Sequence, residues 1–405
     1  MKENKLPIVV VGAGHAGVQV CEVLRNEGCE DDIILISREV SYPYMKPPLS
    51  KKYMNTGFSE DQSLIRPPLF YDKKRISLIL KTAVISLDTK KQEIKLSDGR
   101  TQKYSFLVLA TGTTVRKLSM DIDPSACAYS LFDLEGAEKI KDKKSEYHSC
   151  LVIGGGFIGL ELAASLRTAG LDITLLVASE RILSRTTAKE TAAFITQVHS
   201  RHGVNIITGV SVSRIEKPEE SDKPVTVHCH NGATYQADFV IAGIGVVPEF
   251  SLAQKAGLET DGGVVVDSQC KTSNPHIFSV GDCTVFFCNG KKMHLESIQN
   301  ATDQATVAAR NIMGNVCYYE AVPWFWSDQY DLKLQIAGLN TGYDHVQVLH
   351  REEKKSFVAA YFREEELISV DAINCSKAYM RTKRLLQNRE KWTEKEILNG
   401  DKKII

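Results

Sequence analysis

Residues 8–17 read IVVVGAGHAG, an apolar run followed directly by a glycine-rich turn. The residues after it, 18–24, have the apolar spacing of a helix. A strand, the pattern GxGxxG and a helix, in this order, are typical of a Rossmann dinucleotide-binding unit. The first glycine allows a tight turn, the second lets the backbone approach a pyrophosphate, and the third lets helix and strand pack closely. The stretch therefore predicts a nucleotide site that includes Gly12, Gly14 and Gly17.

The same arrangement occurs a second time at residues 150–164, which read CLVIGGGFIGLELAA. One GxGxxG pattern can arise by chance, but two copies, each between an apolar strand and a helical pattern, indicate two dinucleotide sites. Two further apolar runs, at residues 107–112 and 241–248, end in small-residue turns where backbone can approach a nucleotide closely. The second site is predicted to use Gly154, Gly156, Ile158, Gly159 and Gly245.

An acid near the end of the second strand of such a unit binds the hydroxyls of a ribose. Glu39 lies 22 residues after Gly17, close to the usual interval. In the second copy the strand ends at Val177, and the nearest acid is Glu180, with Arg181 beside it. We expect Glu39 and Glu180 to bind the two riboses. The arginine leaves the choice between NADH and NADPH open.

Composition excludes several classes of protein. The 405 residues carry 50 Lys plus Arg and 50 Asp plus Glu, so the net charge favours neither nucleic acid nor an anionic membrane as a partner. Residues 1–7 are polar, and no apolar run approaches the roughly twenty residues that cross a bilayer. The 10 cysteines include no CxxC pair and no cluster with histidine at metal-ligand spacing. We expect a cytoplasmic protein with buried, reduced thiols, no metal site and no membrane segment.

Several stretches beyond the two glycine motifs resemble one known family. They are residues 46–51 (KPPLSK), 98–112, 272–282, 296–301 (ESIQNA) and 323–329 (PWFWSDQ). Together with the motifs, they are similar to the FAD-containing NAD(P)H:ferredoxin reductases that serve cytochromes P450 and aromatic-ring dioxygenases. The resemblance covers nearly the whole chain. It implies an α/β fold like that of glutathione reductase, with two Rossmann-like dinucleotide-binding domains and a small C-terminal α+β domain.

The resemblance also implies roles for individual residues. Lys51 and Glu161 would be catalytic and would meet near N5 of the flavin. There a lysine stabilises the negative charge of the reduced ring, and a carboxylate keeps the lysine oriented. The residues implied to bind FAD are Gly12, Gly14, Ala16, Gly17, Glu39, Lys51, Val84, Asp282, Ile298 and Trp326, the last lying against the isoalloxazine.

Three positions depart from the family pattern, and one absence distinguishes a subclass. Val177 stands where the family usually has the ribose-binding acid. Lys46 stands where the family usually has arginine, and Phe132 stands where an arginine contact to the cofactor is expected. Disulfide reductases of this fold carry a CxxxxC pair in the region that here reads YPYMKPP, residues 42–48. Cys283 and Cys288 have that spacing but lie in a different, apolar segment, so we expect them to be packing residues. Electrons are therefore expected to pass directly from the flavin to an external acceptor.

The positions of the motifs predict the domain organisation. An FAD-binding domain takes residues 1–116 and 246–323, and an NAD(P)H-binding domain, residues 117–245, is inserted between them. Within residues 324–405, residues 331–336 alternate in polarity, residues 346–348, 357–362 and 367–370 also read as strands, and a helical pattern follows. They predict a small antiparallel sheet followed by a helix from about residue 376 to 388.

The resulting prediction is an FAD-dependent NAD(P)H:ferredoxin oxidoreductase. NADH, with NADPH as the alternative, gives a hydride to FAD, and the electrons leave singly to a [2Fe–2S] ferredoxin or similar carrier of an oxygenase system. Lys377, Arg381 and Arg384 share one face of the last predicted helix and form either a solvated surface or a docking face for an acidic ferredoxin. Two alternatives stay open: an NADH flavoenzyme that reduces rubredoxin, a quinone or dioxygen, and a flavoprotein resembling apoptosis-inducing factor that acts mainly through protein partners.

Overall fold

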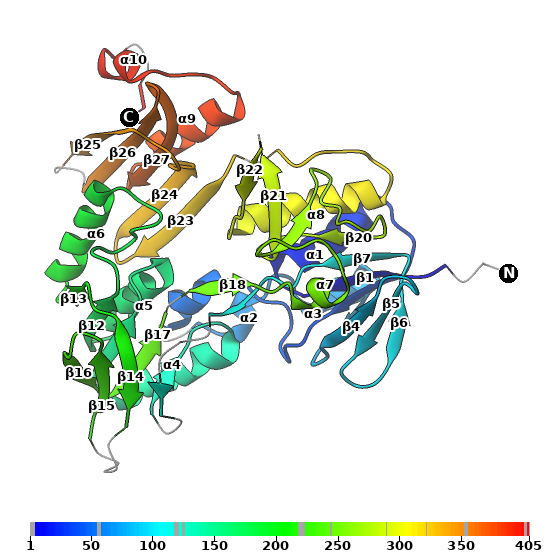
Figure 1. Cartoon of the computed structure of the whole chain (residues 1–405), viewed down its shortest axis with the longest axis horizontal. Helices are drawn as coiled ribbons and strands as arrows, with labels where there is room; N and C mark the ends of the chain where they lie inside the picture. The colour runs from blue at the N-terminus through cyan, green and yellow to red at the C-terminus, as the bar shows by residue number, and fades with distance from the viewer. Residues whose placement is uncertain are drawn as a thin grey trace. The chain divides into compact units, whose positions relative to one another are not determined.

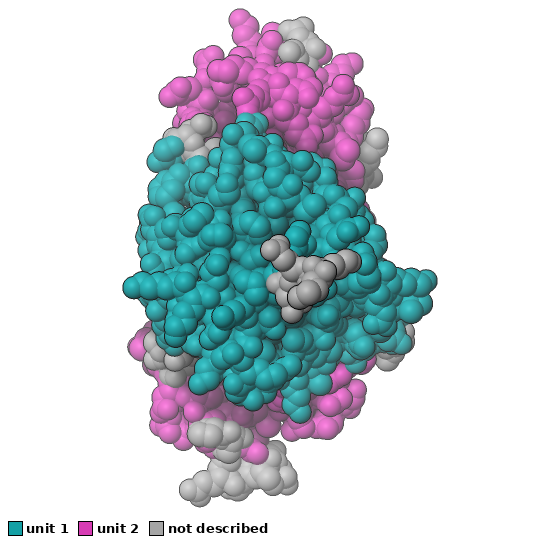
Figure 2. Space-filling view, turned by 90° about the vertical axis from the view of Figure 1, so that its right-hand side faces the viewer, with its two compact units in different colours: residues 1–45, 59–114, 246–321 teal, residues 46–58, 115–245, 322–405 magenta. Residues whose placement is uncertain are grey.

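The computed structural model describes residues 5–54, 58–116, 121–123, 126–217, 223–243, 245–288, 290–320, 322–351, 355–400 and 403–404. The chain divides into two compact units, which Figure 2 shows in different colours. Unit 1 comprises residues 1–45, 59–114 and 246–321, and unit 2 comprises residues 46–58, 115–245 and 322–405. Each unit is therefore assembled from three segments that are far apart in the sequence. The boundaries of the three predicted domains stay a prediction.

Unit 1 is built on a five-stranded parallel sheet with the order β20-β7-β1-β2-β3 (Figure 1). Apolar side chains fill both faces of the sheet, as expected for parallel strands covered on both sides. Helices α1 and α8 share one core cluster with the strands, and a second cluster covers the opposite face. The elements are β1 (Ile8–Val11), β2 (Ile33–Ile36), β3 (Ile76–Ile79), β7 (Phe106–Leu109), β20 (Ile277–Ser279), α1 (His15–Asn26) and α8 (Ile298–Ile312).

Smaller elements complete unit 1. One antiparallel sheet has the order β4-β5-β6, a second sheet has the order β19-β21-β22, and β8 pairs with β18. Their bounds are β4 (Val84–Asp88), β5 (Glu93–Leu96), β6 (Thr101–Lys103), β8 (Thr113–Val115), β18 (Val246–Pro248), β19 (Val264–Val266), β21 (Thr284–Cys288) and β22 (Lys291–Met293). Three short helices are α2 (Glu60–Ser63), α3 (Pro68–Lys73) and α7 (Ser251–Lys255).

Unit 2 contains a second five-stranded parallel sheet, with the order β10-β17-β11-β12-β13. Its strands are β10 (Ala128–Tyr129), β11 (Ser149–Ile153), β12 (Asp172–Val177), β13 (Asn205–Thr208) and β17 (Phe239–Ala242). A smaller sheet has the order β16-β15-β14-β9, formed by β9 (Asp121–Ile122), β14 (Val212–Glu216), β15 (Val225–Cys229) and β16 (Thr234–Ala237). The helices are α4 (Leu134–Glu146), α5 (Phe157–Thr168) and α6 (Lys189–Arg201). Residues 46–58 contribute two 3₁₀ helices, η1 (Pro47–Ser50) and η2 (Lys52–Met54).

The C-terminal part of unit 2 is an antiparallel sheet with the order β23-β24-β27-β26-β25. Its strands are β23 (Trp324–Gln329), β24 (Leu332–Gly338), β25 (His345–Arg351), β26 (Ser356–Arg363) and β27 (Glu366–Ile373). Helices α9 (Ser376–Gln387) and α10 (Glu394–Leu398) follow. The two parallel sheets and this antiparallel sheet confirm the predicted fold class. In the described part of the chain, no helix is long and apolar enough to cross a membrane.

Candidate dinucleotide and electron-transfer site

The carboxyl ends of the parallel strands in unit 1 meet at one edge of the sheet, where a doubly wound fold binds its ligand. Three backbone hydrogen bonds continue the strands past this edge. Gly12 donates to the Ile36 carbonyl at 2.8 Å, Ala110 donates to Val11 at 2.8 Å, and Val280 donates to Leu109 at 3.0 Å. The first glycine motif and the residues after β2, β7 and β20 are thereby brought together.

The three glycines of the first motif have different surroundings, which match the three expected roles. Gly12 has a φ of +106°, and a Cβ there would lie 2.1 Å from the Ala110 carbonyl oxygen. A Cβ at Gly17 would lie 1.8 Å from the Gly12 carbonyl oxygen. At Gly14, by contrast, no described protein atom lies within 4 Å of that position. The backbone is therefore bare at Gly14, where a pyrophosphate would approach, so the motif fits the phosphates of a dinucleotide.

Asp282 and the start of α8 lie against the same helix as the first motif. A Cβ at Gly281 would lie 3.2 Å from Ala16 Cβ on α1 and 3.6 Å from Ala301 Cβ on α8. Asp282 follows directly and is half-buried, and Ile298 is the first residue of α8. Residues predicted from three distant stretches of sequence thus share one region of unit 1. Their binding of FAD stays a prediction.

The acid predicted to hold the FAD ribose is oriented by a tyrosine that the sequence analysis did not identify. Tyr44 is buried, and its hydroxyl donates a hydrogen bond to Glu39 Oε2 at 2.5 Å. The sequence signal was weak, because Tyr44 lies in an irregular segment five residues after Glu39. Val84 begins β4, packs against the core cluster on one face of the sheet and pairs with Leu96 of β5, and its contact with FAD stays a prediction.

The second glycine motif in unit 2 repeats the geometry of the first. Gly154 has a φ of +117°, a Cβ at Gly159 would lie 2.0 Å from the Gly154 carbonyl oxygen, and no described atom lies within 4 Å of a Cβ at Gly156. Ile158, on the first turn of α5, is 42% exposed, and Gly245 is exposed as well. The motif therefore presents bare backbone and an exposed apolar side chain, which suits a second dinucleotide.

Val177, Glu180 and Arg181, which are neighbours in sequence, have different surroundings at the end of β12 and in the loop after it. Glu180 is exposed, whereas Val177 is only 2% exposed and lies under Gly155, where an added Cβ would be 2.8 Å from Val177 Cγ1. The Arg181 guanidinium donates to backbone carbonyls of its own loop, at 2.8 Å to Thr187 and at 3.1–3.3 Å to residues 182–184. Of the three, Glu180 has the exposure that a ribose contact requires.

The two predicted catalytic residues form an ion pair within unit 2. Lys51 Nζ lies 2.7 Å from Glu161 Oε2, and the two side chains are only 17% and 5% exposed. Lys51 follows η1, which two prolines start, and its ammonium also donates to the Pro47 carbonyl oxygen at 3.2 Å. Glu161 lies on α5, five residues after Gly156. The fold therefore couples a cation to the helix of the second glycine motif, and its catalytic role stays a prediction.

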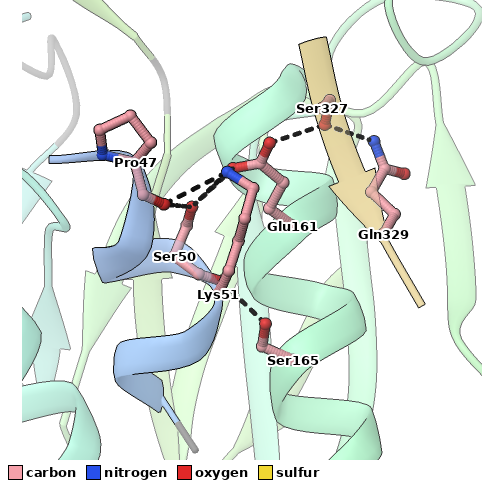
Figure 3. A network of polar contacts seen from close by, with 7 residues as sticks. All are labelled: Pro47, Ser50, Lys51, Glu161, Ser165, Ser327 and Gln329. Carbon is pink, nitrogen blue, oxygen red and sulfur yellow. Dashed lines mark hydrogen bonds and ion pairs between the residues drawn. The ribbon is translucent and has the colours of Figure 1, made fainter. Parts of the chain in front are cut away.

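Further polar residues contact this pair and were not identified from the sequence (Figure 3). Ser50 Oγ donates to Glu161 Oε2 at 2.5 Å, and Ser327 Oγ donates to Glu161 Oε1 at 2.6 Å. Gln329 in turn donates to Ser327 at 3.1 Å. Ser327 and Gln329 belong to the stretch PWFWSDQ, whose resemblance was noted without a role for either residue. Their period of two on β23 was the available signal.

Trp326 is half-buried within an aromatic group of unit 2. Its ring centroid lies 5.6 Å from that of Trp324 and 6.4 Å from that of Phe325, and Phe325 is 4.6 Å from Phe157 in the second glycine motif. The Lys383 ammonium lies 4.4 Å from the Trp324 ring. The predicted flavin contact therefore belongs to the same unit as Lys51, and its contact with the isoalloxazine stays a prediction.

Two of the departures from the family pattern, Lys46 and Phe132, contact each other. Lys46 Nζ lies 4.2 Å from the centroid of the Phe132 ring and donates to the Phe132 carbonyl oxygen at 3.2 Å. A cation over an aromatic face is attracted by the ring's electron density. Lys46 and Phe132 therefore act as a local pair that fixes η1 to the segment before α4.

Nine cysteines are described as free thiols, and six of them are buried. Burial raises the pKa of the Cys21 thiol to about 12 and raises the pKa of Cys150 well above its ordinary value. Cys283 is fully buried, and the Cys288 side chain lies outside the described part of the structure. No group of His, Cys, Asp and Glu that could hold a metal ion occurs among the described residues.

Comparison with known proteins gives two family matches. Residues 6–305 match the model of the pyridine nucleotide-disulphide oxidoreductases, and residues 324–404 match the reductase C-terminal family. The chain is 37% identical to putidaredoxin reductase CamA of Pseudomonas putida over 387 residues, which is 94% of this chain and 92% of the relative. It is 34% identical to a rubredoxin-NAD(+) reductase of Pseudomonas putida over 376 residues, 92% of this chain and 97% of the relative.

A solved structure matches the whole fold. The ferredoxin reductase for the CYP199A2 system from Rhodopseudomonas palustris superposes with a TM-score of 0.92 at 34% identity, and the match covers 96% of both chains. The similarity therefore extends through both parallel sheets and the C-terminal sheet.

Proposed function

The chain belongs to the pyridine nucleotide-disulphide oxidoreductase family, and from that membership we propose that it passes electrons from NADH through FAD to a [2Fe–2S] ferredoxin of an oxygenase system. It is an FAD-dependent NAD(P)H oxidoreductase. FAD supplies the conversion between a two-electron hydride donor and one-electron transfer. Gly12, Gly14, Gly17, Glu39 and Asp282 would hold it.

One observation favours an external acceptor, and not a disulfide of the protein itself, as the group that receives electrons from the flavin. The segment that holds the redox-active cysteine pair in disulfide reductases reads YPYMKPP here, and it leads into η1 and the Lys51–Glu161 pair instead. No thiol is present there to take electrons from a flavin. Two relatives, a putidaredoxin reductase and a ferredoxin reductase, are named after the small carrier proteins that they reduce.

The role we propose for the Lys51–Glu161 pair is electrostatic. The Lys51 ammonium would stabilise negative charge that develops on the flavin, and Glu161 would keep that ammonium charged and in place. The pair is largely removed from water, so its field is screened less than that of a surface ion pair. This role stands on the resemblance together with the observed ion pair.

The proposed docking face for the acceptor is α9. It carries Lys377, Arg381, Lys383 and Arg384 and no acidic residue among its 12 residues. Lys377 and Arg384 are exposed, and Lys383 lies over the Trp324 ring. A cationic face of this kind speeds encounter with an acidic partner and lowers its KM.

Rubredoxin is the second candidate acceptor, because one of the relatives bears that name. We further propose that the protein acts in the cytoplasm, where buried free thiols such as those described here persist.

The experiment that tests this function measures steady-state turnover with NADH and five acceptors: a [2Fe–2S] ferredoxin, rubredoxin, a quinone, dioxygen and ferricyanide. We expect ferredoxin to give the highest kcat/KM among the first four. Faster turnover with rubredoxin, quinone or dioxygen would overturn the assignment. Negligible turnover with all four natural acceptors would favour a protein that acts through binding partners.

Charge reversal tests the docking face separately. The variant Lys377→Glu/Arg384→Glu should raise the KM for ferredoxin about tenfold at low salt and leave ferricyanide turnover unchanged, because only the protein acceptor meets α9. The matched control is Lys95→Glu/Lys103→Glu, which makes the same change of charge at two exposed positions on β5 and β6. Equal effects of both variants would show that overall charge, and not α9, governs docking.

A further inference from the structure

We propose that Ser327, Gln329 and His199 form a buried relay of hydrogen bonds that fixes the orientation of Glu161 and, through it, of Lys51. Figure 3 shows the part of the relay from Glu161 to Gln329. The three residues would be positioning residues for flavin reduction and would not touch the reacting atoms. The inference rests on the role proposed above for the Lys51–Glu161 pair.

The relay is continuous and runs through three elements of unit 2. From Glu161 Oε1 on α5 it passes to Ser327 Oγ at 2.6 Å, from Ser327 to Gln329 Nε2 at 3.1 Å, and from Gln329 Oε1 to His199 Nε2 at 2.8 Å. Ser327 and Gln329 are on β23, and His199 is in the last turn of α6. Ser327 and Gln329 point to the same face of their strand because side chains alternate along it.

The chemistry of the groups fixes the direction of every bond. An ionised carboxylate only accepts hydrogen bonds, so the single hydroxyl hydrogen of Ser327 goes to Glu161. Ser327 Oγ must then accept from the amide nitrogen of Gln329, which leaves the amide oxygen facing His199. His199 must therefore carry its hydrogen on Nε2. Each donor in the relay points toward Glu161, and the relay supports a negative charge there.

Both oxygens of Glu161 are engaged, and from opposite sides. Oε2 receives Lys51 and Ser50, and Oε1 receives Ser327. Ser50 is itself held, because its carbonyl oxygen accepts from Ser165 Oγ at 2.8 Å. Loss of the Oε1 bond would free the carboxylate to rotate about its last side-chain bonds, and the Lys51 ammonium would move with it.

Burial shows that this polar row is costly to maintain. Ser327 and His199 are 0% exposed, and Gln329 is 2% exposed. Burial lowers the pKa of His199 to about 4, so the ring is neutral near pH 7 and has one N–H to give. Its Nδ1 has no hydrogen-bond partner among the described atoms. Apolar residues would fill these positions at a lower cost in free energy of folding. We therefore infer that the polar row is kept because it holds the Lys51–Glu161 pair at its end.

The test is a double-mutant cycle on the rate of flavin reduction by NADH, followed by stopped-flow absorbance in the FAD-loaded protein. Gln329→Met removes both bonds of the amide with little change in volume, and Ser327→Ala removes only the hydroxyl. Each is combined with Lys51→Met, and Gln347→Met on β25 is the matched control, because among the described residues its amide donates to the neighbouring Val348 carbonyl and not to the relay.

We expect Lys51→Met to slow reduction about a hundredfold, and Gln329→Met or Ser327→Ala to slow it about tenfold. In the Lys51→Met background the relay variants should have less than about twofold further effect, because they act through the lysine. Gln347→Met should leave the rate unchanged. This non-additivity separates a positioning role from a general loss of stability, which would multiply the two effects.

Three outcomes overturn the proposal. They are equal slowing by the relay variants in both backgrounds, no slowing by either relay variant, and an unchanged rate in Lys51→Met itself. The last would also remove Lys51 from the proposed mechanism. Because the assay ends at reduced flavin, a failure of ferredoxin as acceptor would leave the result on the relay intact.

Discussion

Arg181 shows how the contacts of one side chain change the meaning of its sequence position. An arginine beside a ribose-binding acid attracts the 2′-phosphate of NADPH when its guanidinium is free. Here the guanidinium donates to carbonyl oxygens of residues 182–187 and closes its own loop. Arg181 is therefore a loop residue, and Glu180 is the exposed charge at this position.

We predict a preference for NADH of about tenfold in kcat/KM, equivalent to roughly 1.4 kcal/mol. Glu180 accepts from the ribose diol and repels a phosphate, but it lies beyond the strand end and so acts more weakly than an acid at the strand end itself. Glu180→Ala should reduce the preference toward unity. Arg181→Ala should weaken both cofactors alike, because it opens the loop. Comparing kcat/KM for NADH and NADPH in the three proteins measures this, and a clear NADPH preference in the parent would contradict it.

The burial of Val177 changes what a carboxylate at this strand end would do. An acid placed there by Val177→Glu would be expected from sequence to sharpen the preference for NADH. The side chain is 2% exposed and packs under Gly155, so a carboxylate would be buried beside backbone without a partner. Such a substitution costs stability in the unliganded protein.

At the scale of elements, α6 is attached to the C-terminal sheet near both of its ends. His199 near its C-terminal end bonds Gln329, and Thr191 near its N-terminal end donates to Asp371 at 2.9 Å. Tyr361 also donates to Asp371, and its hydroxyl accepts the N–H of Ala188. Asp371 is 0% exposed, and its Oδ1 has no partner among the described atoms.

Asp371 predicts a pH dependence of stability. Burial raises its pKa to about 7, although the hydrogen bonds from Tyr361 and Thr191 act in the opposite direction. An unfolded aspartate ionises near pH 3.9, so stabilisation through the protonated form is complete below about pH 4 and is lost as the pH rises through about 7. Asp371→Asn should lack this loss, which is on the order of 2–4 kcal/mol. Thermal unfolding of both proteins between about pH 4 and 8.5 measures it, because the loss accumulates between the unfolded and folded pKa values and is complete above about pH 7. The melting temperature of the variant should rise relative to that of the parent as the pH increases. Melting temperatures that change in parallel with pH would contradict the proposed titration of Asp371.

The elements also show how far sequence reasoning reached. The parallel strands β1, β2, β7, β11, β12 and β17 and the antiparallel strands β24, β26 and β27 were predicted because their buried side chains are apolar, whereas β3, β10 and β13 were not predicted. Strand β23 was missed because its buried residues are Ser327 and Gln329, which an apolar pattern cannot reveal. The relay escaped for the same reason, and its third member comes from a helix more than a hundred residues away. Of the two polar positions that break the local pattern, Ser327 contacts the ion pair and Gln329 reaches it through Ser327, as expected at a functional site.

At the scale of the whole molecule, the residues predicted for FAD are divided between the two units. The glycine motif, Glu39 and Asp282 belong to unit 1, and Lys51 and Trp326 belong to unit 2. Their binding of FAD stays a prediction. The division between the units could not be derived from sequence, because residues 46–58 and 322–405 join residues 115–245 in unit 2 only through contacts between distant segments.

We predict one non-covalent FAD per chain. The bare backbone at Gly14 and the predicted ribose acids Glu39 and Asp282 would supply contacts to phosphate and ribose. Although His15 lies in the first motif, the motifs supply no obvious histidyl or cysteinyl attachment point. The purified protein should be yellow. Acid precipitation should release all of the flavin, which absorbance of the supernatant against protein concentration measures. Colour that stays with the precipitate would contradict the prediction.

The membership of residues 46–58 in unit 2 has a consequence for exchanging modules between reductases. This short insertion interrupts the sequence of unit 1, yet Lys51 pairs with Glu161, Tyr53 donates to Glu138, and Met54 accepts from Lys144. A chimera that grafts a foreign nicotinamide module at the predicted residues 117–245 would keep the native insertion and replace these three partners. The segment to exchange therefore has two parts. An exchange that includes residues 46–58 together with the module preserves the contacts between these two parts.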